Sequence, residues 1–211
     1  MADQITPTKA NLLAIKKNLE LAKSGFDLLD RKRNVLMREM MRLIDQAVIL
    51  QRDIGDTFSR AYQSLEMANV TMGIETTLEN FTPEETGFEM TTRSVMGVDL
   101  PTTSLNATQP KPFYGFWGSN AYMDSTYILF DRVKELSARL AGTENSVYRL
   151  AMAIKKTQRR ANMLENVVVP RYEAAVKFIS GVLEEHEREE FTRLKVIKQR
   201  KESQKKLRRI S

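Results

Sequence analysis

Apolar residues recur at alternating steps of three and four through the first third of the chain. The series runs from Leu12 to Ile54, and Arg33 is its one polar member. Such spacing keeps an apolar seam on one side of a helix and is typical of a left-handed coiled coil. We therefore predict a long helix over residues 6–69, capped at its start by Thr6. Its candidate seam residues are Leu12, Ile15, Leu19, Phe26, Leu29, Leu36, Leu43 and Leu50.

The same spacing returns in the last third of the chain, between Thr126 and Val182, and keeps its phase across Pro170. An interior proline costs a helix about 3 kcal/mol, because it removes a hydrogen bond and clashes with an earlier carbonyl. Each well-buried aliphatic side chain offsets about 1.5–3 kcal/mol of that cost. We therefore predict a continuous helix over residues 120–200 that is kinked near Pro170. Its candidate seam residues are Leu136, Leu140, Leu150, Ile154, Leu164, Val168 and Phe178.

The segment between the two helices, residues 70–119, has a different composition. It contains most of the prolines and several glycines, and the stretch GFEMTTRSVMGVDLPTTSL is rich in Thr, Val and Met. This pattern predicts a short β-hairpin with Met96 and Gly97 at its turn. An aromatic cluster, KPFYGFWGSNAY, follows it and leads to a helix capped near Ser119 or Asn120. Because an isolated hairpin is marginal in water, we expect it to pack on this cluster or on another subunit.

Two long helices joined by an insert of this length can fold back on each other. The predicted fold is mostly α: a long antiparallel two-helix left-handed coiled coil, with a small insert containing a short β-hairpin. Matching the two seams places Leu12 opposite Val182 and Leu65 opposite Leu129. Residues 201–211 form a basic tail.

Composition supports long helices and leaves little equipment for catalysis. Only nine glycines and six prolines occur in 211 residues, and 28% of the residues are charged. Cysteine is absent and His186 is the one histidine, so thiolate metal sites are excluded and nucleophilic catalysis is poorly equipped. Neither a P-loop nor a G-x-G-x-x-G motif is present. We expect no catalytic residue, no metal and no cofactor, and no run is apolar enough to insert into a membrane.

Basic residues are the remaining candidates for partner contacts. Arg33 interrupts the first seam, as Arg171 interrupts the second, and either side chain can extend out of the seam or help to fix the register. Further candidates, by charge alone, are Lys155, Lys156, Arg159 and Arg160. Solvated helix faces explain such stretches equally well. A nucleic-acid or membrane-surface binder acting through Arg193–Arg209 is a third possibility, but the tail lacks the interleaved aromatic residues that nucleic-acid binding favours.

Four segments, in order along the chain, resemble one family. They are PTKANLL at Pro7–Leu13, RSVMGVDLP at Arg93–Pro101, YGFWGSNAYMD at Tyr114–Asp124, and KTQRRANMLENVVVPRYEAAVKFI at Lys156–Ile179. Together they are similar to the D subunit of V-type and archaeal A-type ATPases. Pro170 stands where that family's helix carries its proline.

The resemblance implies a central rotor shaft without an ATP site, which couples ATP hydrolysis or synthesis to ion translocation by mechanical rotation. The partners it implies are the F subunit, the catalytic A and non-catalytic B subunits, and the funnel-shaped C/d subunit of the membrane ring. It implies a peripheral location on the cytoplasmic side of the membrane, within the soluble sector, and no nucleic-acid partner. A coiled-coil scaffold or adaptor is the alternative function.

Overall fold

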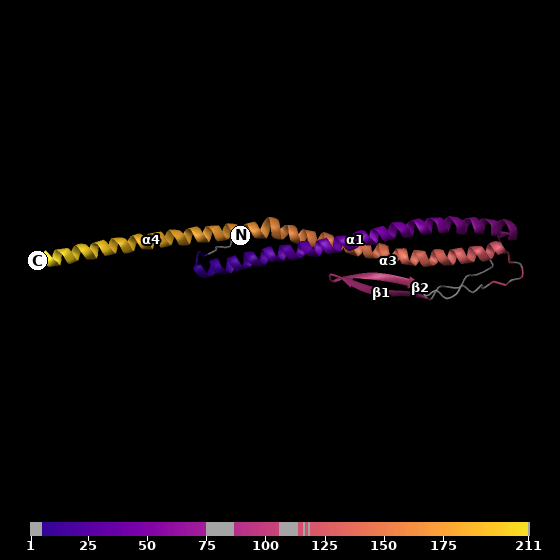
Figure 1. The fold of residues 1–211 in the computed structure, drawn as a ribbon, viewed down its shortest axis with the longest axis horizontal. Helices are drawn as coiled ribbons and strands as arrows, with labels where there is room; N and C mark the ends of the chain where they lie inside the picture. The colour runs from indigo at the N-terminus through magenta and orange to yellow at the C-terminus, as the bar shows by residue number, and fades with distance from the viewer. Residues whose placement is uncertain (1–5, 75–86, 106–113, 116, 118, 211) are drawn as a thin grey trace. The chain divides into compact units, whose positions relative to one another are not determined.

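The computed structural model describes residues 6–74, 87–105, 114, 115, 117 and 119–210. The chain divides into two compact units, one formed by the residues up to Arg31 and from Gln158 onward, the other by Lys32–Thr157. The predicted mostly α fold with a two-stranded antiparallel hairpin is confirmed, whereas the left-handed supercoil stays a prediction. In chain order the elements of Figure 1 are α1 (Lys9–Met72), β1 (Phe88–Val95), β2 (Val98–Leu105), α3 (Ala121–Met163), the π-helical segment η1 (Leu164–Val168) and α4 (Val169–Ile210).

Side chains and backbone groups close the helix ends. Thr8, rather than the predicted Thr6, caps α1, because its hydroxyl accepts a hydrogen bond from the Asn11 N–H at 3.2 Å. Gly73 ends the helix with a φ of +86°, a conformation that suits glycine at this position. The Asn120 carbonyl accepts the Met123 N–H at 2.8 Å at the start of α3, as the sequence predicts.

Within each unit, two helices run antiparallel. Lys9 Nζ lies 2.8 Å from Glu187 Oε1, and Lys23 Nζ lies 2.7 Å from Glu173 Oε1. As the chain advances along α1 from Lys9 to Lys23, its partner on α4 therefore moves back from Glu187 to Glu173, which is an antiparallel pairing. These exposed ion pairs contribute little stability, but they record the register.

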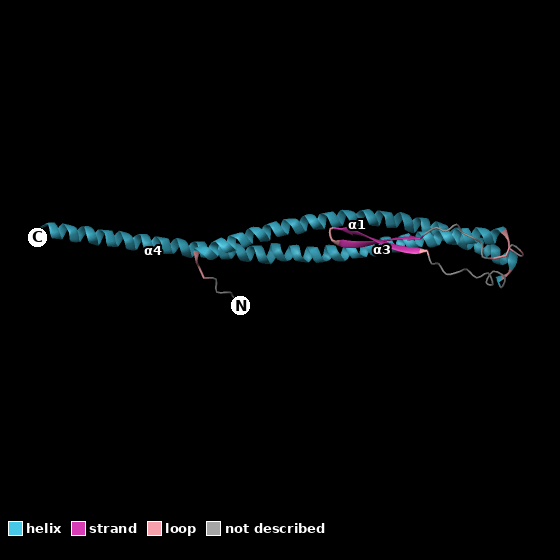
Figure 2. Ribbon diagram, turned by 90° about the horizontal axis from the view of Figure 1, so that it is seen from below, coloured by secondary structure: helices cyan, strands magenta, loops and turns pink. Residues whose placement is uncertain are grey.

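In the other unit, Gln51 Nε2 donates to Glu144 Oε1 at 3.1 Å and Ser64 Oγ donates to the Tyr122 carbonyl at 3.0 Å. Figures 1 and 2 show α1 and α3 side by side in this unit. Both units therefore follow the antiparallel arrangement that the sequence predicts.

The hairpin is part of the core of the Lys32–Thr157 unit. Leu100 of β2 is buried together with Leu36 and Leu43 of α1 and Leu150 of α3. The hairpin thus packs on the chain's own helices, which the sequence pattern did not predict, and packing on the aromatic cluster or on another subunit stays a prediction. The small residues of α3 leave room for β2 beside the two helices. Within the described part of the aromatic cluster, Trp117 is fully exposed.

The helix continues through Pro170 without a break, because α3, η1 and α4 follow one another directly. The Val169 N–H donates to the Leu164 carbonyl, five residues earlier, which is the π-helical pattern. A π-helical turn accommodates one extra residue at the point where proline cannot donate a hydrogen bond and its ring crowds the preceding turn. The kink predicted at this point stays a prediction.

The extra residue of η1 changes which side chains are buried downstream. Phe178, which the heptad spacing places in the seam, is 59% exposed, whereas Ile179 is fully buried. The sequence pattern was wrong at Phe178 because it assumed uniform helical spacing across Pro170. Every other candidate seam residue is buried or half-buried.

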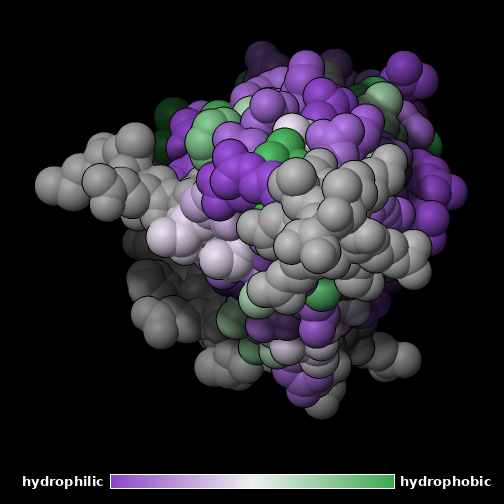
Figure 3. Space-filling model, turned by 90° about the vertical axis from the view of Figure 1, so that its left-hand side faces the viewer, coloured by the Kyte–Doolittle hydropathy of each residue, from purple (hydrophilic) through white to green (hydrophobic). Residues whose placement is uncertain are grey.

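Hydrophilic side chains cover most of the described face in Figure 3, with only scattered hydrophobic ones between them.

The burial of Ile179 in place of Phe178 can be tested by substituting each of these two neighbouring residues. Ile179→Ala deletes a fully buried side chain, and we expect it to lower the free energy of unfolding by about 2–5 kcal/mol. Phe178→Ala is the matched control, and because its ring is exposed we expect a change within about 0.5 kcal/mol. Urea denaturation followed by circular dichroism measures both. A larger loss of stability in Phe178→Ala than in Ile179→Ala would show that Phe178, not Ile179, packs in the seam.

Candidate functional site

The most elaborate contacts among the described residues surround the hairpin. We call the residues of α1 and α3 that hold it the hairpin cradle: Leu36, Glu39, Leu43, Gly142, Ser146 and Arg149. The hairpin itself is closed by Met96 and Gly97, with φ values of 51° and 74°. Two consecutive positive φ angles make a type I′ turn, whose twist matches that of paired strands. The hairpin is thus locally well formed before it meets the helices.

Side chains of α3 hold the main chain of β2. Ser146 Oγ donates to the Pro101 carbonyl at 2.8 Å, and Arg149 Nη1 donates to the Asp99 carbonyl at 3.1 Å. In the other direction, Thr103 Oγ1 donates to the carbonyl of Ala138 at 2.5 Å. These contacts span about three turns of α3, so β2 follows the middle part of that helix.

Gly142 allows the close approach of β2 to α3. A Cβ atom at this position would lie 3.0 Å from the Thr103 nitrogen and still closer to its hydroxyl. Only glycine leaves that space empty, which explains its presence inside a helix despite its low helical propensity.

Glu39 links the hairpin to α1. Its carboxylate accepts hydrogen bonds from Arg42 of α1, at 2.7 Å, and from Arg93 of β1. The Glu39 side chain is only 17% exposed. The hydrogen bond from Arg42 lowers the pKa of Glu39 below its ordinary value, and that from Arg93 adds to the effect against the opposing influence of burial. One carboxylate therefore serves two guanidinium groups.

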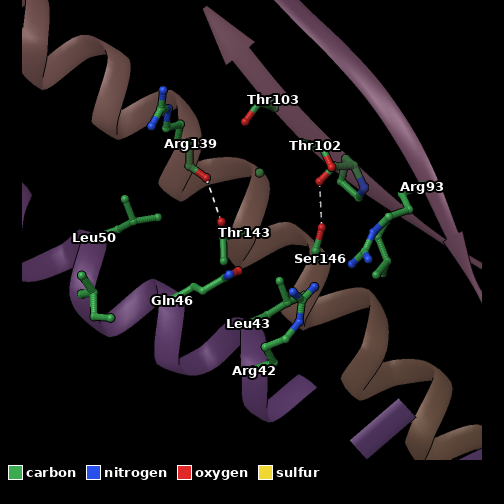
Figure 4. A pocket seen from close by; sticks show the side chains of 14 residues that line it. Arg42, Leu43, Gln46, Leu50, Arg93, Thr102, Thr103, Arg139, Thr143 and Ser146 are labelled. Carbon is green, nitrogen blue, oxygen red and sulfur yellow. Dashed lines mark hydrogen bonds between the residues drawn. The ribbon is translucent and has the colours of Figure 1, made fainter. Parts of the chain in front are cut away.

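A cavity of about 550 Å³ lies between β2, α1 and α3 (Figure 4). Its apolar wall comes from Leu43, Leu50 and Leu100, and its polar rim includes Thr143, whose hydroxyl donates to the Arg139 carbonyl at 2.9 Å. The described residues contain no group of three potential metal ligands. The arrangement holds a strand against two helices.

The sequence-predicted contact residues lie elsewhere. Arg33 is half-buried and donates to Asn34 Oδ1 at 3.4 Å. Met96 and Gly97 form the exposed turn, and Pro170 is exposed at the start of α4. The basic residues exposed toward the end of α3 include Lys155, Lys156, Arg159 and Arg160. The roles assigned to all of them stay predictions.

The hairpin cradle is not among the sites that the sequence pattern predicts. A usable signal was present, because Ala138, Gly142 and Ser146 are small residues at four-residue spacing on one face of α3. Such a stripe lets another backbone approach a helix closely. The Glu39–Arg93 contact had no comparable signal, because its members are 54 residues apart in the chain.

A second surface lies on α4. Residues 184–202 are exposed on all sides, and Phe191, Leu194 and Ile197 form an exposed apolar row at three-residue spacing. None of the helices in the described part of the chain contains an apolar stretch of the length and hydropathy that spanning a bilayer requires. An apolar row on a charged helix of this kind is suited to contact with a partner protein.

The close approach at Gly142 can be tested by adding one methyl group. Gly142→Ala places a Cβ against Thr103, and we expect hydrogen exchange of the β2 amides to become faster as the strand moves away from α3. Gly55→Ala is the matched control, because no atom lies within 4 Å of its added Cβ. We expect it to stabilise α1 by up to about 1 kcal/mol. Equal gains in melting temperature for both variants would contradict the close approach.

Glu39 predicts a pH dependence of hairpin docking. Its pKa is lower in the folded chain than in the unfolded chain, so its contribution to stability is present above pH 4.5 and is lost as the pH falls through the folded-state pKa. Hydrogen exchange of the hairpin amides, measured from about pH 6 to about pH 3 and corrected for intrinsic rates, should show this loss. Glu39→Gln should remove that part of the pH dependence. Identical pH profiles for the two proteins would argue against it.

Comparison with known proteins places most of the chain in one family. The sequence model of the family described as the D subunit of ATP synthase matches residues 11–199. The V-type ATP synthase D subunit of Thermotoga neapolitana is 43% identical over 198 residues, which cover 93% of this chain and 98% of the relative. The A-type ATP synthase D subunits of Thermococcus sibiricus and Thermococcus kodakarensis are 34% and 36% identical, over 92% of this chain and 94% and 93% of their own lengths. The antiparallel helices and the hairpin cradle described above therefore belong to a member of the D-subunit family of ATP synthases.

Proposed function

We propose that this chain is the central-stalk rotor subunit of a V-type ATPase or ATP synthase. In this role it couples ATP hydrolysis or synthesis in the catalytic hexamer to ion translocation by mechanical rotation. The chain itself is non-catalytic, and the nucleotide chemistry belongs to the A subunits. Its location is peripheral, on the cytoplasmic side of the membrane and within the soluble sector.

The observation that carries this proposal is the pairing of two antiparallel helices over a buried apolar seam in each unit. A pair of helices that share a packed seam resists twisting better than one helix, because relative rotation would expose the buried side chains. Leu36 and Leu150 are both fully buried from opposite helices of one unit. Ala22 of α1 and Ile179 of α4 are buried in the other. Resistance to twisting is the property that a torque-carrying subunit needs.

The surfaces of α4 support a contact with the catalytic hexamer of A and B subunits. Its residues 184–202 are exposed, and they carry the apolar row Phe191, Leu194 and Ile197. The F subunit and the funnel-shaped C/d subunit are the further partners in this proposal. The candidate contacts with partner subunits are the exposed basic residues Lys155, Lys156, Arg159 and Arg160.

The π-helical segment supplies a local asymmetry. Its one extra residue makes the stretch around Pro170 unlike a regular helix. A rotor must present a different surface to each of three otherwise equivalent catalytic interfaces, so a local irregularity of this kind can bias them in turn. Pro170 is exposed, which keeps it accessible to a surrounding partner.

A coiled-coil adaptor remains the competing function, and affinity purification distinguishes the two. A rotor copurifies with the F subunit and with the A and B subunits in a nucleotide-hydrolysing complex. An adaptor copurifies with other proteins. Mass spectrometry of the purified complex identifies which set is present.

The role of Pro170 in coupling can be tested in the reconstituted complex. We expect Pro170→Ala to lower the number of ions transported per ATP hydrolysed, because the helix no longer needs the irregular turn. ATP hydrolysis and ion transport are measured on the same preparation. Val167→Ala, an exposed position of η1, is the control and should leave the ratio unchanged. An unchanged ratio in Pro170→Ala would limit the proline to a role in packing.

A further inference from the structure

The hairpin has two edges, and the turn determines which main-chain groups lie on each. In a β-turn the first residue accepts a hydrogen bond from the fourth, so Val95 and Val98 form a hydrogen-bonded pair. Hydrogen-bonded pairs alternate with non-hydrogen-bonded pairs along an antiparallel ladder. The main-chain groups of the intervening residues therefore point outward: on β2 those of Asp99, Pro101 and Thr103, and on β1 those of Met90, Thr92 and Ser94.

The outer edge of β2 is closed by α3. The carbonyls of Asp99 and Pro101 accept hydrogen bonds from Arg149 and Ser146, which confirms independently that they point away from β1. Pro101 has no N–H to satisfy, so proline suits this edge position. Figure 1 shows β2 between β1 and α3. No further strand can pair with this edge.

Within the part of the chain that the structure describes, no element pairs with the outer edge of β1. All residues from Phe88 to Ser94 are exposed, and the pairing with β2 is continuous, without a bulge. Proteins usually protect an exposed edge with proline, lysine, a bulge or a covering element. The strand FEMTTRSV contains neither proline nor lysine, and its charged residues Glu89 and Arg93 both lie on the other face from Phe88 and Met90. Among the described residues, no main-chain hydrogen bond outside the hairpin involves Met90, Thr92 or Ser94.

The side chains beside this edge add specificity. Phe88 and Met90 are 52% and 63% exposed and share one face of the strand. Arg93, on the other face, is 51% exposed and shares the carboxylate of Glu39 with Arg42. Glu89 is also exposed and lies on the same face of β1 as Arg93, so this face carries one acidic and one basic side chain. An incoming segment would therefore match this edge with apolar side chains on one face and with charged side chains, among them a carboxylate for Arg93, on the other.

We infer that the outer edge of β1, from Phe88 to Ser94, binds an extended strand from another subunit of the ATP synthase. The incoming strand extends the hairpin to a three-stranded sheet through main-chain hydrogen bonds. Its apolar side chains pack on Phe88 and Met90, and an acidic side chain lies near Arg93. The inference rests on membership in the D-subunit family and on the hairpin geometry, and it does not depend on the rotor role.

Hydrogen exchange of the full chain, alone and in the reconstituted soluble complex, tests the inference. We expect the amides of Met90, Thr92 and Ser94 to exchange quickly in the isolated chain and at least about tenfold more slowly in the complex. The inward-pointing amides of the hairpin should be protected in both. Equal rates for the three outward amides in the two samples would overturn the inference.

Two substitutions distinguish main-chain pairing of a partner strand with β1 from a contact made through side chains alone. Thr92→Pro removes an outward N–H that β2 does not use, so the hairpin should stay intact while the affinity of the chain for the soluble complex falls about tenfold. Met90→Lys keeps every main-chain donor and places a charge on the open edge, and a similar fall is expected. Thr92→Ala is the matched control and should leave the affinity unchanged.

Three further results would overturn the inference. Unchanged affinity in both Thr92→Pro and Met90→Lys would show that the edge is not paired. An equal loss in Thr92→Ala would assign the effect to the threonine side chain. Protection of the outward amides that rises with concentration in the isolated chain would identify a second copy as the occupant. Each result leaves the Pro170 coupling experiment unaffected, so failure here and failure of the rotor proposal are distinguishable.

Discussion

An apolar side chain on a long helix is removed from water only where another element covers it, and this constraint governs the structure. The moderately apolar α1 would be marginal alone, because most helical stability comes from packing of one face. Its buried side chains, such as Leu36 and Leu43, meet Leu150 of α3 within one unit. Antiparallel return of the chain supplies the second apolar face from the same polypeptide. The pairing, the register and the position of the hairpin all follow from this requirement.

The hairpin cradle shows how two types of secondary structure share one core. Leu100 contributes apolar area to the helix pair, while Ser146 and Arg149 satisfy the carbonyls of β2 that would otherwise face a helix. Gly142 provides the space for this contact. Because α3 closes one edge of the hairpin, the opposite edge is left facing outward. The same packing that stabilises β2 thus creates the surface that we assign to a partner strand.

The π-helical segment resolves a conflict between local and tertiary requirements. Pro170 cannot take part in a regular helical turn, yet the helix has to continue in order to cover α1. One extra residue in the turn accommodates the proline at the cost of a change in helical phase. Ile179 rather than Phe178 then faces α1, and Phe178 is left exposed on the surface. A strictly local irregularity in this way alters the surface that a partner meets further along the helix.

The sequence by itself determined the two long helices, the hairpin with its turn at Met96 and Gly97, and the family resemblance, because periodicity and turn chemistry are local properties. It also indicated that the helix passes through Pro170, since apolar spacing resumes on the far side. The phase beyond Pro170, the Glu39–Arg93 contact and the packing of β2 against Gly142 were decided only by the tertiary structure. These features depend on which side chains meet across tens of residues and on how one turn absorbs a proline, and heptad spacing contains neither kind of information.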